Sequence, residues 1–133
     1  MSEANPQPHA AADGGQVGLV PITLLDAIRN NDDKTWEKLA PRYGVTNPDP
    51  PWKVSLYATC ECLAAGEALP LVERRRAEDQ LGETLYSGTP APEQQLLALA
   101  HIMLSRGLVS EEDLARRMVV VRSRLEGGLV ART

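Results

Sequence analysis

The stretch TPAPEQQLLALAHIMLSRG, from Thr89 to Gly107, decides the fold, because its apolar residues lie between the start and stop signals of a helix. Thr89 is a candidate N-cap, and Pro90 suits the first turn because its φ is already helical. Gly107 suits a left-handed C-cap. The apolar residues between these signals are Leu96, Leu97, Leu99, Ala100, Met103 and Leu104. We expect one helix here, packed in the core.

Working toward the C-terminus, Ser110 and Asp113 have the spacing of a helix start, and two glutamates in the first turn favour it further. An apolar stripe with spacings of four, three and four follows: Leu114, Met118, Val121 and Leu125. This pattern predicts an amphipathic helix. Gly127 and Gly128 are expected to end it.

Toward the N-terminus, a short helix is expected from Leu71 to about Asp79, interrupted near Gly82. Before it, a helix is expected from about Trp52 to Gly66, with one face made of Trp52, Leu56, Cys60 and Leu63. The proline-rich segment 46–51 predicts a stiff loop.

Residues 22–44 predict two short helices broken near Asn30–Asp33, with Pro41 and Gly44 at the end. Thr23 and Asp26 have capping-box-like spacing. No segment shows a convincing strand period, since the helical stripe explains "MVVVR" better. We therefore predict an all-α domain of about five helices over residues 22–133.

Residues 1–21 contain prolines and glycines and few large apolar groups, which predicts a flexible arm. The segment lacks the basic start and apolar core of a secretory signal. No apolar run is long enough to cross a membrane, so we expect no membrane association and a cytoplasmic location.

The formal net charge of −4 disfavours a general nucleic-acid binder, and with it a small helical DNA-binding domain. Cys60 and Cys62 point about 200° apart on a helix, which argues against a disulfide between them. Neither His9 nor His101 has ligand spacing to them, so no metal site is expected in this chain. The simpler interpretation is two small buried apolar residues, and for His101 a partly buried, hydrogen-bonded side chain.

The run Arg74–Arg75–Arg76 is the main candidate for function. On a helix the three side chains fan out by about 100° each, so they cannot all face one ligand. Glu78 and Asp79 stand four residues after Arg74 and Arg75 and are candidate ion-pair partners. Composition by itself favours a solvated helix face over an anion-binding site.

An ordered series of motifs then adds a resemblance. The series is LYATCECLA (56–64), ERRR (73–76), LGETLY (81–86) with Gly88 and Pro90, QLLALAHIML (95–104), and GLVSEEDLARRM (107–118) followed by VRSRL. It resembles the helical N-terminal half of nitrile hydratase β subunits and the β subunit of thiocyanate hydrolase, over about residues 52–128.

The resemblance implies a subunit that binds no metal itself. The Co(III) or Fe(III) would lie in an α-type partner subunit, held by a cysteine claw whose oxidised sulfurs carry negative oxygens. Arg75 is implied as the catalytic-site residue that contacts this claw, because an arginine fork suits such an anion. Implied residues of the subunit interface or the pocket wall are Trp52, Tyr57, Arg74, Arg76 and Tyr86.

Three departures from the family pattern bear on this expectation. The chain stops without the family's C-terminal β-barrel, which favours enzymes of three subunits, such as toyocamycin nitrile hydratase, whose barrel is a separate partner. Ala91–Pro92 replaces a common pair of tyrosines, which favours a larger nitrile, such as a nucleoside nitrile. A thiocyanate hydrolase β subunit and a nitrile hydratase activator that escorts the metal subunit are the alternatives. A third departure is Glu67, which stands where the family has a glycine.

Overall fold

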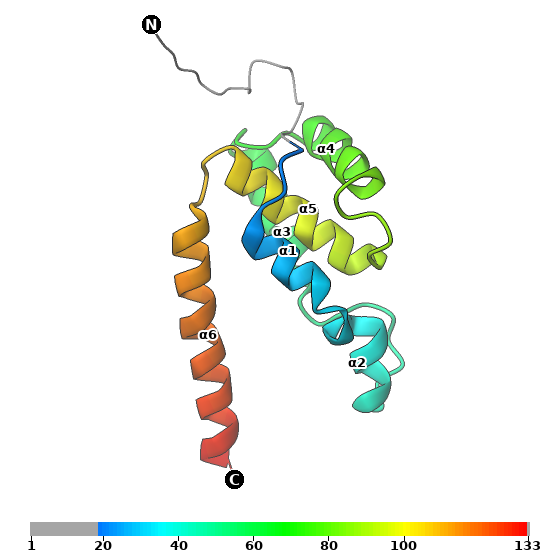
Figure 1. The fold of residues 1–133 in the computed structure, drawn as a ribbon, viewed down its shortest axis with the longest axis vertical. Helices are drawn as coiled ribbons and strands as arrows, with labels where there is room; N and C mark the ends of the chain where they lie inside the picture. Colours follow the sequence, from blue (N-terminus) through cyan, green and yellow to red (C-terminus); the bar gives the residue numbers. More distant parts are fainter. Residues whose placement is uncertain (1–18, 133) are drawn as a thin grey trace, which may run out of the picture.

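The computed structural model describes residues 19–132, with the side chains of all of these except Asp32 and residues 128–132. Residues 1–18 of the expected flexible arm lie outside this range. Within it every regular element is helical, which confirms the all-α prediction (Figure 1). The elements are α1 (Thr23–Asn30), the 3-10 turn η2 (Asp32–Lys34), α2 (Trp36–Arg42), α3 (Lys53–Ala65), α4 (Leu71–Glu83), α5 (Ala91–Ser105) and α6 (Glu111–Arg132). The first helical region splits into α1 and α2, as the sequence indicates.

Helix α5 is the centre of the fold, and α1, α3 and α4 each pack against it. Five of its side chains are buried, including three consecutive ones, so it is enclosed on more than one side: Leu97, Ala98, Leu99, His101 and Ile102. The core is completed from the surrounding helices and loops by Leu25, Leu56, Cys60, Leu69, Ala77, Leu81 and Tyr86. The expected core role of the 89–107 helix is therefore confirmed.

The N-termini of α1 and α2 are capped by carboxylates from distant parts of the chain. The Leu24 amide donates to Glu111 Oε2 at 3.0 Å, and the Trp36 amide donates to Glu93 Oε2 at 2.7 Å. Neither residue before these helices makes a side-chain cap, so the capping box expected from Thr23 is wrong. For α5 the N-cap is Pro90 and not Thr89. For α6 the expected cap is confirmed, because the Asp113 amide donates to Ser110 Oγ at 3.0 Å.

Two helices run further than the sequence indicates, because glycine lowers helix stability by about 1 kcal/mol without forbidding the helix. Helix α4 continues through Gly82, where a Cβ would lie 2.8 Å from Gln94 Oε1 of α5. Glycine therefore leaves room there for the side chain of Gln94. Helix α6 continues through Gly127 and Gly128 to Arg132. By contrast, Gly44 and Gly107 take positive φ angles of 68° and 74° after α2 and α5, as expected of terminating glycines.

Helix α6 is joined to the body mainly at its N-terminal end, and its far half extends away from the other helices (Figure 1). None of the helices over residues 19–132 is long and apolar enough to cross a membrane.

Candidate functional site

The arginine run lies on α4, which begins directly after Pro70 and buries Ala77 and Leu81 toward α5. These two residues define the inward face of the helix. A residue two positions before Ala77 is turned by about 160° from it, so Arg75 lies on the face opposite the core. Both Arg75 and Arg76 are exposed, whereas Arg74 is only 14% exposed. The helix therefore offers one arginine inward and two outward.

Arg74 pairs with Glu78, as the sequence predicts, with 3.8 Å between Nε and Oε2. Burial raises the pKa of Glu78, and the guanidinium of Arg74 opposes that rise. The Oε2 atom of Glu78 is buried and makes no hydrogen bond among the described residues. Arg74 thus has a structural role as the counter-charge of a partly desolvated carboxylate.

Glu73 fixes the start of α4 to the end of α5. Its Oε1 accepts from Arg106 Nη2 at 2.6 Å, and Arg106 Nη1 donates to the carbonyl of Ala68 at 3.2 Å. One guanidinium therefore joins the loop before α4, the first turn of α4 and the C-cap of α5. This clamp orients the helix that carries the arginine run.

Arg75 lacks the local partner that its spacing suggested. In the part of the chain that the structure describes, no ion pair joins Arg75 to Asp79, so that prediction is wrong. Asp79 is itself exposed. The guanidinium of Arg75 is exposed and makes no ion pair among the described residues.

The structure places Tyr86 in the core and not at the surface. Its side chain is 0% exposed, and its hydroxyl lies 2.7 Å from Nδ1 of the equally buried His101. Burial raises the pKa of Tyr86 to about 12. The hydrogen bond expected for His101 is confirmed, and its burial is complete rather than partial. Because Tyr86 is buried, it presents no exposed surface to a partner subunit. Its expected role at an interface or in a pocket therefore receives no support.

Trp52 lies directly before α3 and Tyr57 lies within it, on a different helix from the arginine run. Trp52 borders an apolar groove of about 270 Å³ between α3 and α5, together with Leu56 and Leu99. Tyr57 is 45% exposed, and Lys53 Nζ lies 5.4 Å from its ring centroid. Since α3 and α4 pack on α5 separately, the structure does not gather the predicted residues into one cavity.

The two cysteines of α3 differ in environment. Cys60 is buried in the core and Cys62 is exposed, so the expectation of two buried residues is wrong for Cys62. Over residues 19–132, no group of three or more histidine, cysteine, aspartate or glutamate side chains could hold a metal ion. His9 lies outside that range.

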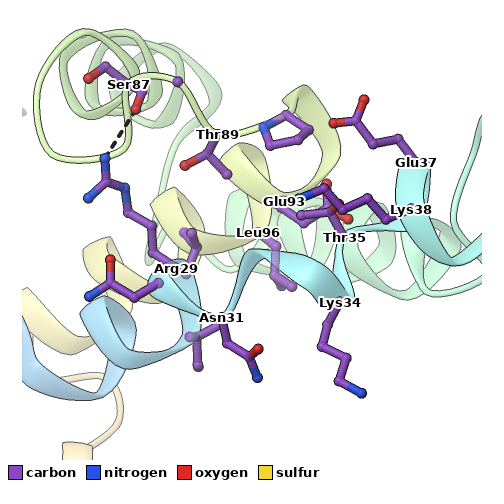
Figure 2. A pocket seen from close by; sticks show the side chains of 15 residues that line it. Arg29, Asn31, Lys34, Thr35, Glu37, Lys38, Ser87, Thr89, Glu93 and Leu96 are labelled. Atoms are coloured by element: carbon purple, nitrogen blue, oxygen red, sulfur yellow. Dashed lines mark hydrogen bonds between the residues drawn. The ribbon is translucent and has the colours of Figure 1, made fainter.

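A pocket with a volume of about 460 Å³ lies where α1 and α2 meet the start of α5. Figure 2 shows Arg29, Thr35 and Glu93 on its wall, with Arg29 donating to the Ser87 carbonyl at 3.2 Å. Among the described residues, Thr35 Oγ1 and Glu93 Oε1 are buried and lack hydrogen-bond partners. None of the predicted site residues lines this cavity. No local sequence pattern predicts this pocket, because its walls come from segments about 60 residues apart in the chain.

Comparisons with known proteins give one partial match. The chain is similar to the thiocyanate hydrolase subunit beta of Thiobacillus thioparus, with 35% identity over 78 residues. The match covers 58% of this chain and 50% of that subunit, so the chain spans about half the length of the curated relative it matches. No family model matches the chain, and no solved structure does.

Proposed function

We propose that this chain is a β-type subunit of a heteromeric enzyme of the nitrile hydratase and thiocyanate hydrolase group. In this proposal Arg75 extends from α4 to the oxidised cysteine ligands of a Co(III) or Fe(III) ion held by an α-type subunit. Trp52, Tyr57 and Arg76 face partner subunits, one of them a separate β-barrel chain. The bound metal would act as a Lewis acid toward a carbon–nitrogen triple bond.

The observation that carries the proposal is the position of Arg75. It lies opposite the buried face of α4 on a helix whose start is clamped by Glu73 and Arg106. A fixed forked cation facing outward suits negative oxygens at an interface, because two parallel N–H donors match two acceptor oxygens. The similarity to a thiocyanate hydrolase subunit supports the same group of enzymes.

Two substrate classes follow from different observations. The name of the similar subunit favours thiocyanate. The Ala91–Pro92 pair favours a larger nitrile, such as a nucleoside nitrile as in toyocamycin nitrile hydratase. A pocket of about 460 Å³ lies next to this pair in sequence, lined by Pro90 and Glu93, although none of the expected site residues lines it. That volume is within the range of small-molecule sites. We place the nitrile first.

The test is co-expression of this chain with the products of neighbouring genes, followed by assays of nitrile and thiocyanate turnover. Arg75→Lys should lower kcat of the purified assembly by about 10- to 100-fold, since lysine keeps the charge but not the fork. The visible absorption of the metal centre should change as well. Arg42→Lys makes the same change at an exposed arginine of α2 outside the expected site, so it is the matched control and should retain activity. Full activity and an unchanged spectrum in Arg75→Lys would contradict the proposal.

An accessory protein that escorts the metal subunit is the second candidate function, because nitrile hydratase activators resemble the same helical half. A catalytic subunit stays with the metal subunit at fixed stoichiometry in the active enzyme, whereas an escort leaves after loading. Size-exclusion chromatography of the active enzyme with quantified bands distinguishes the two.

A further inference from the structure

Helix α6 carries an apolar seam that this chain does not fully cover. The seam consists of Leu114, Met118, Val121 and Leu125. Met118 is 37% exposed and Leu125 is 64% exposed, whereas Leu114 and Val121 are half-buried. Val119 and Val120 are also exposed but lie outside the seam. The far half of the helix extends away from the other helices (Figure 1). Most helices in proteins are stabilised by packing of their apolar face. A 22-residue helix that contains two glycines is not expected to be stable without such packing.

The spacing of the seam indicates what shape of partner fits it. Intervals of four, three and four are those of alternate d and a positions in a heptad pattern. Such a stripe is narrow and packs against another helix through knobs-into-holes contacts, whereas a sheet or a flat surface calls for a broader apolar face.

The charges beside the seam indicate the chemistry of that helix. Arg117 and Arg124 lie along one side of the seam and Arg122 lies along the other, all three exposed and at the positions that face a partner's flanks. Two of the three acidic groups in the first turn of α6 already have partners in this chain, since Glu111 accepts from the Leu24 amide and Asp113 pairs with Arg116. A complementary helix therefore carries aspartate or glutamate at its own flanks.

A second copy of this chain fits poorly. In a parallel pair Arg117 of one copy would face Arg122 of the other, and in an antiparallel pair flanking arginines again meet arginines. A membrane surface also fits poorly, because membrane-surface helices present a wide apolar face with bulky or aromatic residues. The seam consists of only four residues, and the chain contains no phenylalanine.

We propose that α6 is a docking helix that pairs through this seam with an acid-flanked amphipathic helix of a partner subunit. The inference deepens the proposed function, on which it rests only for the identity of that subunit. The electrostatic part of the contact sets the choice of partner, and the apolar part supplies most of the stability.

The test uses the full chain and two synthetic peptides of about three heptads each, with identical apolar a and d positions. One peptide has glutamate at the e and g positions and the other has lysine there. Isothermal titration calorimetry should show the glutamate peptide binding at least tenfold more tightly, with affinity falling as salt rises.

Variants locate the contact. Changing Arg117, Arg122 and Arg124 together to glutamate should reverse the preference toward the lysine peptide, a gain that unfolding of α6 cannot produce. Arg116→Glu makes the same kind of change off the seam and should leave the preference as it is. Met118→Lys should weaken binding of both peptides.

Several outcomes would overturn the inference. These are equal or absent binding of the two peptides, and a triple variant that still prefers glutamate. A chain that sediments as a dimer until Met118→Lys is introduced would make a second copy the occupant. Binding to phosphatidylcholine vesicles containing phosphatidylserine, lost in the same variant, would make it a membrane. If the peptides do not bind as expected but activity still depends on Arg75, only the docking inference is wrong. If the peptides bind as expected but activity does not depend on Arg75, only the proposed function is wrong.

Discussion

At the scale of single residues, the contact between Tyr86 and His101 is the main polar feature of the core. The ring centroids are 5.6 Å apart in an edge-to-face arrangement, and the hydroxyl meets Nδ1 of the imidazole at 2.7 Å. A buried hydroxyl needs such a partner, because leaving it unpaired costs about 1–3 kcal/mol. The pair therefore fixes the segment after α4 against the middle of α5.

Tyr86→Phe should lower the free energy of unfolding by about 1–3 kcal/mol while leaving the helical content unchanged. The reason is that the imidazole loses a buried hydrogen-bond partner while the packing volume is almost conserved. Urea unfolding followed by circular dichroism measures the change. Tyr57→Phe removes an exposed hydroxyl and should stay within about 0.5 kcal/mol of the parent. Equal effects of the two substitutions would show that the core contact adds nothing.

The same hydroxyl predicts a pH dependence. Burial raises the pKa of Tyr86 to about 12 in the folded chain, against about 10 for an unfolded tyrosine. The neutral form is thus favoured in the folded state, so this stabilising contribution is complete below pH 10 and is lost as the pH rises toward 12. Unfolding at several pH values should show a steeper loss in the parent than in Tyr86→Phe, which removes the group. Parallel curves would contradict the assignment.

At the scale of elements, the junction between α3 and α4 carries a backbone strain. Glu67 has a φ of +64°, the left-handed region that favours glycine. The family resemblance places a glycine at this position, and the structure shows that Glu67 adopts the backbone conformation that glycine would favour there. The turn keeps its form because Leu69, buried at 0% exposure just after it, donates its amide to the Leu63 carbonyl at 3.1 Å.

Glu67→Gly should therefore raise the free energy of unfolding by up to about 1 kcal/mol, because a non-glycine residue in this region costs roughly 1–2 kcal/mol and glycine's extra chain entropy offsets part of the gain. Gly107→Ala makes the opposite change at a φ of +74° and should be destabilising by a similar amount. Chemical denaturation of both variants and of the parent measures whether the free energy of unfolding rises in Glu67→Gly and falls in Gly107→Ala. A destabilised Glu67→Gly would show that the side chain of Glu67 matters more than its backbone.

At the scale of the whole molecule, the structure is a helical body around α5 with one projecting helix. The outward arginines of α4 and the apolar seam of α6 both lie on surfaces that the described chain leaves open. These are the two surfaces that the proposed function and the further inference assign to contacts with other chains.

The isolated chain should accordingly retain no metal. Over residues 19–132 no cluster of metal-ligating side chains exists, and Cys60 and Cys62 point to different environments. Dialysis against Co²⁺, then against buffer, followed by elemental analysis, should give far less than one equivalent. Stoichiometric cobalt held by the purified chain would contradict the assignment of the metal to a partner subunit.

The sequence by itself determined the helical class, the core role of the 89–107 segment, the break between the first two helices and the pairing of Arg74 with Glu78. These features depend on residues close together in the chain, through helical periodicity, turn chemistry and i,i+4 spacing. The resemblance that singled out Arg75 was equally readable from the order of the motifs.

Only the tertiary structure decided the burial of Tyr86, the capping of α1 and α2 by Glu111 and Glu93, and the cavity beside Pro90. It also decided that α4 passes through Gly82 and that Arg75 lies on the face away from the core. Each of these depends on which helices meet in space, across separations of tens of residues. Local propensity contains no information about such meetings, since a glycine or a glutamate has the same intrinsic preferences whatever helix later packs beside it.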